Sequence, residues 1–179
     1  DSTILVAAHK QAGAQEIMQR IRYAYESVPD HIRAGVTEYN KGSISFDNGS
    51  RIVAATTTEN TGRGMSLTLV YLDEFAFVPQ RIASEFWTAL SPTLATGGKC
   101  IALSTPNGMG NWFHQTWTGA EEGTNTFNFI KLHWTVHPNR GQEWREEQAK
   151  LLGPDMAAQE CDCDFISSGN TVIPGPILK

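Results

Sequence analysis

The sequence predicts an α/β fold in which a mostly parallel β-sheet is flanked by helices. Three short and mostly apolar runs, at 4–8, 67–72 and 99–103, have the composition of strands that are covered on both faces. Helical patterns alternate with these strands along the chain, which is the order of elements in α/β proteins. Polar residues follow the apolar runs directly, and ligands of open α/β sheets bind at the carboxyl ends of the strands.

The first half of the chain alternates between strand and helix patterns. The expected elements, in order, are a strand at 4–8, a helix at 12–27 and strands at 36–39, 43–46 and 51–55. The helix is indicated by apolar residues at spacings of three and four, and Pro29 ends it. Asn48 and Gly49 lie between the last two strands, where an Asn-Gly pair is the strongest short signal for a hairpin.

The second half continues the alternation. The expected elements are a loop at 56–66, strands at 67–72, 99–103 and 127–133, and helices at 79–90, 111–118 and 142–152. Pro79 suits the first turn of its helix, because the N–H that proline lacks has no partner there in any case. The stretch 167–179 is rich in Gly and Pro, which predicts a linker leading out of the domain.

Composition excludes several classes of protein. The chain has 179 residues, 40% of them hydrophobic and 18% charged, without repeats, so disorder, collagen and coiled coil are excluded. No apolar stretch approaches the about 20 residues that span a bilayer. The net charge of -5 gives no overall attraction to nucleic acid, so any contact with DNA has to be local. The odd number of cysteines is typical of reduced cytosolic thiols.

Two adjacent carboxylates, Asp73 and Glu74, follow the second apolar strand and are the first candidates for chemistry. In nucleotide hydrolysis the first carboxylate of such a pair can hold Mg²⁺, commonly through water. The second can orient the attacking water or accept its proton. The alternative is a solvated strand end that caps the next helix.

Ser104 and Thr105 end the next apolar strand, with one predicted helix between them and the carboxylates. A neighbouring parallel strand would place these hydroxyls beside the carboxylates, where they can sense whether a γ-phosphate is present. The alternative is that they cap the following helix or belong to a turn set by the Pro-Asn-Gly sequence at 106–108.

A phosphate-binding loop is missing from the sequence. No segment matches G-x-x-x-x-G-K-[ST]: the Gly-Gly-Lys-Cys at 97–100 lacks the hydroxyl, and the Gly-Arg-Gly at 62–64 lacks the lysine. The chain also opens directly in a buried-strand pattern without an N-terminal Met. These observations suggest a fragment that begins inside a fold, with its phosphate loop before Asp1, or else a protein that does not hydrolyse nucleotides.

Six motifs in order, together with a phrase near the end of the chain, resemble the ATPase domain of the large terminase subunit of tailed phages, the T4-like DNA-packaging motor. The motifs lie at 4–10, 39–43, 47–50, 63–66, 69–75 and 104–108. The segment at 159–173, which is the phrase near the end of the chain, resembles the part of that family's sequence that connects the ATPase domain to the nuclease domain. The resemblance implies a RecA-like ASCE ATPase fold over residues 1–166 that lacks its N-terminal Walker A part, followed by a linker at 167–179.

The resemblance also implies roles for individual residues. Asp73 and Glu74 match the Walker B pair, in which Asp73 holds Mg²⁺ and Glu74 is the catalytic glutamate. Ser104 and Thr105 match the coupling motif that passes the nucleotide state to the DNA-moving parts. Arg63 matches an arginine that, in parts of the family, is proposed to reach a neighbouring subunit's γ-phosphate; the alternative is a salt-bridged or solvated loop arginine.

The implied function is an ATP-hydrolysing motor that uses ATP and Mg²⁺ to drive double-stranded DNA into the procapsid. The implied partners are double-stranded DNA, the portal protein, the small terminase subunit and further copies of the subunit in a ring, in the host cell cytoplasm and without a membrane. Because the Walker A loop and the nuclease are both absent from the sequence, the fragment alone is expected neither to package nor to cut DNA.

Two other interpretations stay open at the level of sequence. Half of a superfamily 2 helicase would also carry an Asp-Glu strand end followed by a serine-containing strand end, although the Ala-Asp or Ala-His and the Ser-Ala-Thr of that family are replaced here. A non-catalytic α/β interaction module with an ATPase-like frame would account for the missing phosphate loop.

Overall fold

The structure is a computed structural model of the 179-residue chain, and it describes residues 1–166. The chain divides into two compact units, Asp1–Ser104 and Thr105–Lys179. The expected linker at 167–179, and with it the end of the 159–173 phrase, lies outside the described residues. The expectation of one partial ATPase domain over residues 1–166 stays a prediction. Within those residues, no helix is both long enough and apolar enough to cross a membrane.

The first unit is built on a six-stranded sheet in the order β2-β3-β4-β1-β5-β6. The strands are β1 (Thr3–Ala8), β2 (Val36–Tyr39), β3 (Ser43–Phe46), β4 (Arg51–Thr56), β5 (Leu69–Asp73) and β6 (Lys99–Ala102). β4, β1, β5 and β6 run parallel, whereas β2 pairs antiparallel with β3, and β3 with β4. The sheet is therefore mostly parallel, and the Asn48–Gly49 turn joins an antiparallel pair, as the sequence predicts.

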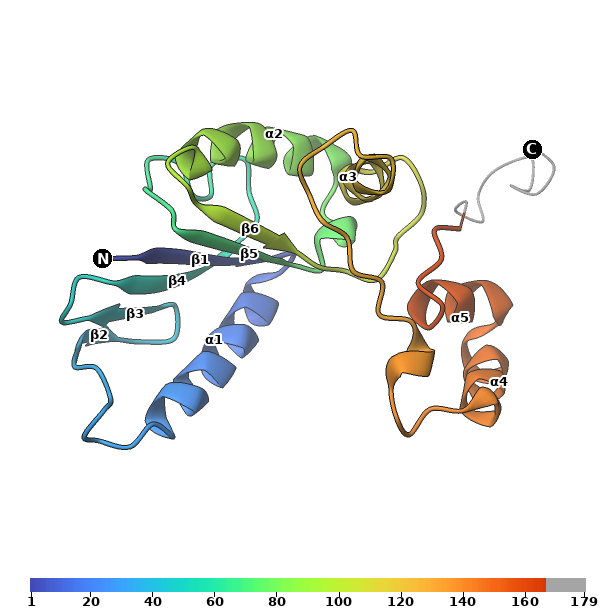
Figure 1. Cartoon of the computed structure of the whole chain (residues 1–179), viewed down its shortest axis with the longest axis horizontal. Coiled ribbons are helices and arrows are strands. Elements are labelled where there is room, and N and C mark those ends of the chain that lie inside the picture. The colour runs from blue at the N-terminus through green and yellow to red at the C-terminus, as the bar shows by residue number, and fades with distance from the viewer. Residues whose placement is uncertain (167–179) are drawn as a thin grey trace. The chain divides into compact units, whose positions relative to one another are not determined.

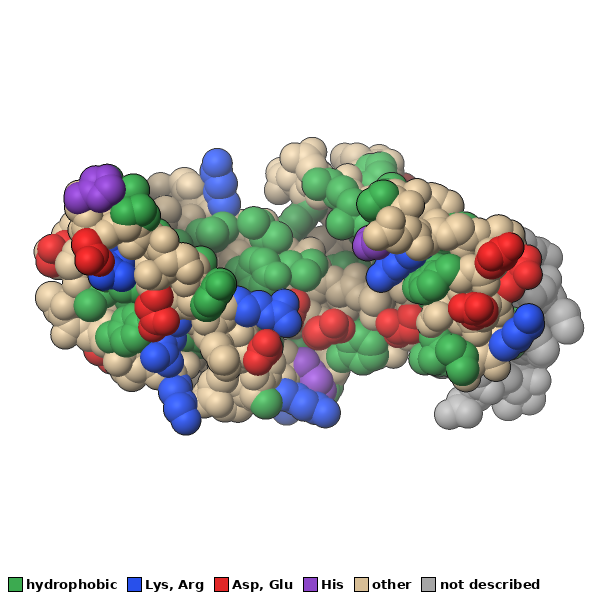
Figure 2. All heavy atoms as spheres, turned by 90° about the horizontal axis from the view of Figure 1, so that it is seen from below, with side chains coloured by type: hydrophobic (Ala, Val, Ile, Leu, Met, Phe, Trp, Pro, Cys, Tyr) green, Lys and Arg blue, Asp and Glu red, His purple; other side chains and the backbone are tan. Residues whose placement is uncertain are grey.

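Helices lie on both faces of this sheet (Figure 1). The elements are α1 (Gln11–Glu26) and α2 (Gln80–Leu90), with short 3-10 turns at Phe75–Phe77 and Ser91–Leu94. Ala14 and Met18 of α1 are fully buried in one cluster with Ile44 of β3 and Ala54 of β4. On the face shown in Figure 2, Lys and Arg side chains are interspersed with Asp and Glu side chains.

The strand β6 corrects one expectation about burial. The sequence predicts a strand buried on both faces at 99–103, but Ile101 keeps 50% of its surface exposed, and Leu103 just beyond the strand keeps 36%. The reason is its position, because β6 is the last strand of the sheet in the described part of the chain. An apolar run shows that a strand can be covered, but only the strand order shows whether it is.

The second unit contains helices and, within its described residues, no strand. Its elements are α3 (Trp112–Glu121), a 3-10 turn at Trp134–Val136, α4 (Gln142–Leu152) and α5 (Pro154–Glu160). The strand predicted at 127–133 is wrong: Ile130 and Leu132 are 76% and 70% exposed, and no sheet pairing forms there. A strand needs the backbone of a neighbour, and the described residues of this unit do not supply one. The helices predicted at 111–118 and 142–152 are confirmed.

Candidate functional site

The candidate site begins at the carboxyl end of β5. Val70 and Leu72 of this strand are fully buried, and they anchor it beside β1, where Asp73 lies opposite Ala8. Asp73, the last residue of the strand, is half-buried. Burial raises the pKa of this carboxyl, while the positive charge of Arg20 on α1 and the backbone N–H of Glu74 oppose the rise in the pKa. A cation placed next to Asp73 would stabilise the ionised form that burial disfavours.

Glu74 occupies a left-handed backbone conformation, with φ 51° and ψ 39°. This region costs about 1–2 kcal/mol for a residue that has a Cβ, so the surrounding structure has to impose it. Two buried residues flank the turn: Leu72, two positions before Glu74, is 0% exposed, and Phe75, directly after it, is 1% exposed and packs on Phe86 of α2 with ring centroids 5.7 Å apart. The sharp turn therefore leaves the Glu74 side chain exposed between two buried anchors.

Ser104 is held at the turn that follows Glu74. The chain beyond β6 continues along this turn, where Phe75 donates its N–H to the carbonyl of Leu103 at 3.2 Å. The Ser104 hydroxyl then accepts the N–H of Ala76 at 3.2 Å. The neighbouring parallel strand β6 thus brings Ser104 to the turn after Glu74, while the predicted position of its hydroxyl beside the carboxylates stays a prediction. Its role as a sensor of phosphate stays a prediction.

Thr105 has a different partner from Ser104. The boundary between the two compact units falls at the peptide bond that joins these residues. Within the second unit, the Thr105 hydroxyl donates to Glu160 Oε1 of α5 at 3.5 Å, the long limit for a hydrogen bond. The same carboxylate oxygen accepts the side-chain amide of Gln159 at 3.0 Å. The hydroxyls of Ser104 and Thr105, the two residues of the predicted coupling motif, therefore form hydrogen bonds with different partners.

Arg63 is exposed on the loop between β4 and β5. It lies between Gly62 and Gly64, which both have positive φ, and its own N–H donates to the carbonyl of Asn60 at 3.2 Å. Gly62 is buried so closely that a Cβ there would lie 2.7 Å from a methyl carbon of Leu90. The loop is thus fixed at its glycine, while the arginine beside it keeps its side chain at the surface.

A salt bridge near this loop was missed by sequence reasoning. Arg81 of α2 contacts Glu59 of the Arg63 loop at 2.8 Å and Glu85 of its own helix at 2.9 Å. The i,i+4 spacing of Arg81 and Glu85 is visible in the sequence. The pairing with Glu59 is not, because it depends on how the loop folds back onto α2.

The Mg²⁺ site predicted at Asp73 stays a prediction, and a single carboxylate would hold the ion only together with water and phosphate oxygens. Across residues 1–166, no group of three or more His, Cys, Asp or Glu side chains is placed to hold a metal ion. Mg²⁺ sites of nucleotide enzymes commonly use only one or two carboxylates and complete the shell with water and phosphates. Asp73 matches that pattern. His133 and His137 are hydrogen-bonded, His133 with Thr135 and His137 with the N–H of Asn139.

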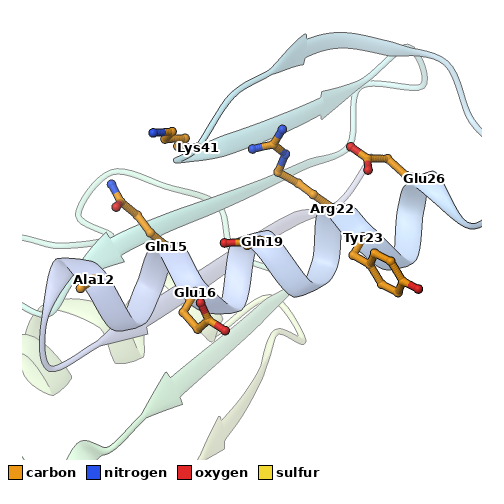
Figure 3. Close-up of a pocket in the computed structure, with 8 residues that line it drawn as sticks. All are labelled: Ala12, Gln15, Glu16, Gln19, Arg22, Tyr23, Glu26 and Lys41. Carbon is orange, nitrogen blue, oxygen red and sulfur yellow. The ribbon is translucent and has the colours of Figure 1, made fainter.

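A separate hollow of about 570 Å³ lies along α1 and the turn between β2 and β3 (Figure 3). None of Asp73, Glu74 and Ser104 lines it. It is therefore distinct from the candidate site at the β5 end.

Comparisons with known proteins support the resemblance that the motifs indicate. The model of the family described as terminase large subunit, T4likevirus-type, N-terminal, matches residues 1–179. The large terminase subunits of Thermus phage G20c and Thermus virus P23-45 are each 35% identical over 130 residues, covering 63% of this chain and 26% of each relative. The aligned part of the chain thus spans about a quarter of the length of these relatives.

Solved structures show the same fold. A mutant form of the ATPase domain of the large terminase of Thermus phage P74-26 superposes with a TM-score of 0.70 at 24% identity, covering 92% of this chain and 77% of that chain. The large terminase of a thermophilic bacteriophage, in complex with ADP, superposes with a TM-score of 0.67 at 12% identity, covering 92% of this chain and 40% of that chain. The six-stranded sheet with its flanking helices is thus the RecA-like fold of phage large terminase ATPase domains.

Proposed function

Because the chain belongs to the terminase large subunits of the T4-like-virus type, we propose that it is part of the ATP-hydrolysing motor that drives double-stranded DNA into the phage procapsid. The alignment covers only 26% of each curated relative, so the activity of the whole subunit is a proposal for this chain. The observation that carries it is the turn at the end of β5. That turn exposes Glu74 between two buried residues and holds Ser104 beside it.

We assign the role of general base to Glu74. A base has to reach the attacking water, and an exposed carboxylate on a rigid turn can do so without moving the sheet. Asp73 is the residue that would hold Mg²⁺, which when bound stabilises charge on the phosphate oxygens. The Ser104 hydroxyl accepts a hydrogen bond at the same turn, so a movement of this turn is passed to the chain that follows β6.

The phosphate loop is supplied, in this proposal, by polypeptide outside residues 1–166. Such a loop follows a strand and opens a helix, and its amides face the carboxyl ends of parallel strands. In the described sheet the open parallel edge next to the carboxylates is that of β6, where Ile101 is half exposed. A further parallel strand at this edge would cover Ile101 and bring a phosphate loop to the end of the sheet that bears Asp73 and Glu74.

The partners of this motor follow from the same family membership and remain proposals. They are double-stranded DNA, the portal protein, the small terminase subunit and further copies of the subunit in a ring on the procapsid. Arg63 is the candidate for a contact between copies, because its loop is anchored at Gly62 while its side chain is exposed.

The replacement Glu74→Gln in the full-length subunit tests the catalytic assignment. It keeps the size of the side chain and removes its basicity, so ATP binding should persist while turnover falls by at least ~10²-fold, the low end for losing a general base. Steady-state ATPase rates and a nucleotide-binding titration measure the two effects separately. The control is Glu147→Gln on the exposed surface of α4, which should leave the rate unchanged. Turnover of Glu74→Gln within a few-fold of the unmodified subunit would remove Glu74 from this role.

A further inference from the structure

The hollow between α1 and the turn joining β2 to β3 has the size and the side chains of a ligand site. Its volume of about 570 Å³ lies within the range of small-molecule pockets, which is roughly 300–1,000 Å³. The lining residues are Ala12, Gln15, Glu16, Gln19, Arg22, Tyr23, Glu26 and Lys41. In Figure 3, Gln15 and Arg22 extend from the helix toward the hairpin that carries Lys41, whereas Glu16 and Tyr23 extend away from the hairpin.

The polar wall of this hollow is one stripe of α1. Gln15, Gln19 and Arg22 recur at spacings of four and three, so they share one face of the helix. The neighbouring stripe contains the fully buried Ala14 and Met18 and packs on the sheet. The helix therefore presents a row of hydrogen-bond donors directly beside its buried stripe, at a place where the hairpin forms the opposite wall.

Arg22 lies in this wall, and within residues 1–166 its guanidinium forms no ion pair with a carboxylate. Its guanidinium carbon lies 4.5 Å from the centre of the Tyr39 ring, which fixes the group in place by a cation–π contact. Its Nε is buried and, among residues 1–166, has no hydrogen-bond partner. The nearby Glu26 carboxylate accepts the hydroxyl of Tyr39 instead of pairing with Arg22. The arginine is thus held in place by packing and keeps its charge uncompensated.

Lys41 lies on the opposite wall, in a turn that is held by several hydrogen bonds. The Asn40 side-chain oxygen accepts the N–H groups of Gly42 and Ser43 at 2.7 and 2.8 Å. The turn is also tied to β4, because Ala54 donates its N–H to the carbonyl of Gly42 at 2.7 Å. Lys41 is exposed, and the described residues contain no ion pair to its ammonium group. Two unpaired cations therefore face one hollow in a chain whose net charge is -5.

The two carboxylates of the hollow already have partners. Glu16 pairs with Arg20 at 3.3 Å, and Glu26 accepts the hydroxyl of Tyr39. Glu26 keeps its negative charge, because a hydrogen bond from a hydroxyl does not neutralise a carboxylate. The other polar groups of the hollow are a guanidinium, an ammonium and two side-chain amides, which can all donate hydrogen bonds. A ligand that matches this set carries negative charge and several acceptor oxygens, as a phosphate group does.

We propose that the hollow between α1 and the β2–β3 turn binds a phosphate group through Arg22 and Lys41, with Gln15 and Gln19 as additional hydrogen-bond donors. The phosphate belongs either to a nucleic-acid backbone or to a free polyphosphate. The site does not contain the carboxylates at the end of β5, so it goes beyond the proposed ATP hydrolysis and does not depend on it.

Calorimetric titration of the 179-residue chain tests this site with two probes at one fixed ionic strength: inorganic pyrophosphate and a short DNA duplex. The double variant Arg22→Met and Lys41→Met should weaken binding by about tenfold or more, the loss expected when charge-assisted hydrogen bonds are removed. Methionine keeps an apolar stem over the Tyr39 ring. The matched control is Lys150→Met on α4, which removes one positive charge from an exposed helix of the other unit and should leave affinity within about twofold.

A gain-of-binding variant keeps the test informative if Arg22→Met impairs folding. Gln15→Lys adds a cation to the same wall and should tighten binding severalfold. Loss of pyrophosphate binding in the double variant assigns the site to free phosphates, and loss of duplex binding alone assigns it to a nucleic-acid backbone. The proposal is wrong if neither probe binds at low millimolar concentration. It is also wrong if Lys150→Met weakens binding as much as the double variant does. An effect of Glu74→Gln on pyrophosphate affinity would also overturn it, because the bound phosphate would then lie at the β5 end.

Discussion

At the scale of single residues, Glu74 combines an unusual backbone conformation with a proposed catalytic role. Its left-handed backbone is flanked by buried residues and turns its carboxylate outward. A residue that stability alone selected at such a position would be glycine or asparagine, since both tolerate positive φ. The presence of glutamate there is consistent with the proposed role of its side chain, which the activity of Glu74→Gln tests.

This strain predicts an order of stabilities among variants of Glu74. Glu74→Gly should raise the free energy of unfolding by up to about 1 kcal/mol, because relief of the strained φ outweighs the entropy of glycine in the unfolded chain. Glu74→Val should lower it by about 1 kcal/mol or more, since β-branched residues are most restricted there. Urea unfolding of the 179-residue chain measures both changes. Equal stability of the glycine and valine variants would show that the turn is not strained in solution.

Asp73 predicts a pH dependence of stability with a definite sign. Its pKa is raised in the folded chain, chiefly by burial, so between the ordinary carboxyl pKa and the raised one the folded state binds more protons than the unfolded state. Stability attributable to this group therefore falls as pH rises through that window. Asp73→Asn should be more stable than the unmodified chain at pH 7, and the difference should vanish as pH falls below the ordinary carboxyl pKa. Urea midpoints at several pH values test this, with Glu147→Gln on the exposed surface of α4 as the control.

At the scale of elements, α4 and the residues after α5 are joined by one strong ion pair. Arg145 of α4 donates from Nε and from a terminal nitrogen to the two oxygens of Asp162, at 2.7 and 2.6 Å. The side chains are only 15% and 22% exposed, and His133 lies 3.7 Å from the same carboxylate. Such a bidentate, half-buried pair stabilises more than an exposed one.

Arg145→Met should therefore lower the free energy of unfolding of the second unit by about 1–3 kcal/mol at pH 7. The guanidinium holds the pKa of Asp162 below its ordinary value, so this contribution is present above the ordinary carboxyl pKa and is lost as pH falls through the lowered one. Fluorescence of Trp134 and Trp144, whose ring centres are 6.3 Å apart beside this pair, reports the unfolding. A loss below about 0.5 kcal/mol would show that this ion pair stabilises the unit no more than an ordinary exposed salt bridge does.

At the scale of the whole molecule, the proposal of a motor includes a contact between copies of the subunit, and Arg63 is its candidate. Arg63 is exposed on a loop that is anchored at Gly62, which suits a role toward a neighbouring copy. An arginine that stabilises charge in a phosphoryl-transfer transition state is worth about 10³ to 10⁵ in rate. Full-length Arg63→Ala subunits alone and Glu74→Gln subunits alone should therefore both be nearly inactive.

Mixing these two variants tests the contact between copies. If Arg63 acts on its neighbour, mixed assemblies should recover part of the ATPase rate, because some interfaces then join an intact Glu74 to a neighbour's intact Arg63. Co-assembly is confirmed by mass before the rates are compared. No recovery in confirmed mixed assemblies would assign Arg63 to its own subunit or to bracing its loop.

Local patterns in the sequence predicted most of the elements and the place of the candidate site. Periodicity identified the helices, and the apolar run before Asp73 placed the carboxylates at a strand end, because these patterns depend on residues close together in the chain. These local patterns could not determine that β6 is an edge strand, that 127–133 lacks a partner, or that Ser104 and Thr105 bond to different groups. Those outcomes depend on which segments lie side by side. Pairing of distant backbones and burial by distant side chains decide them, and neither is encoded in a local pattern.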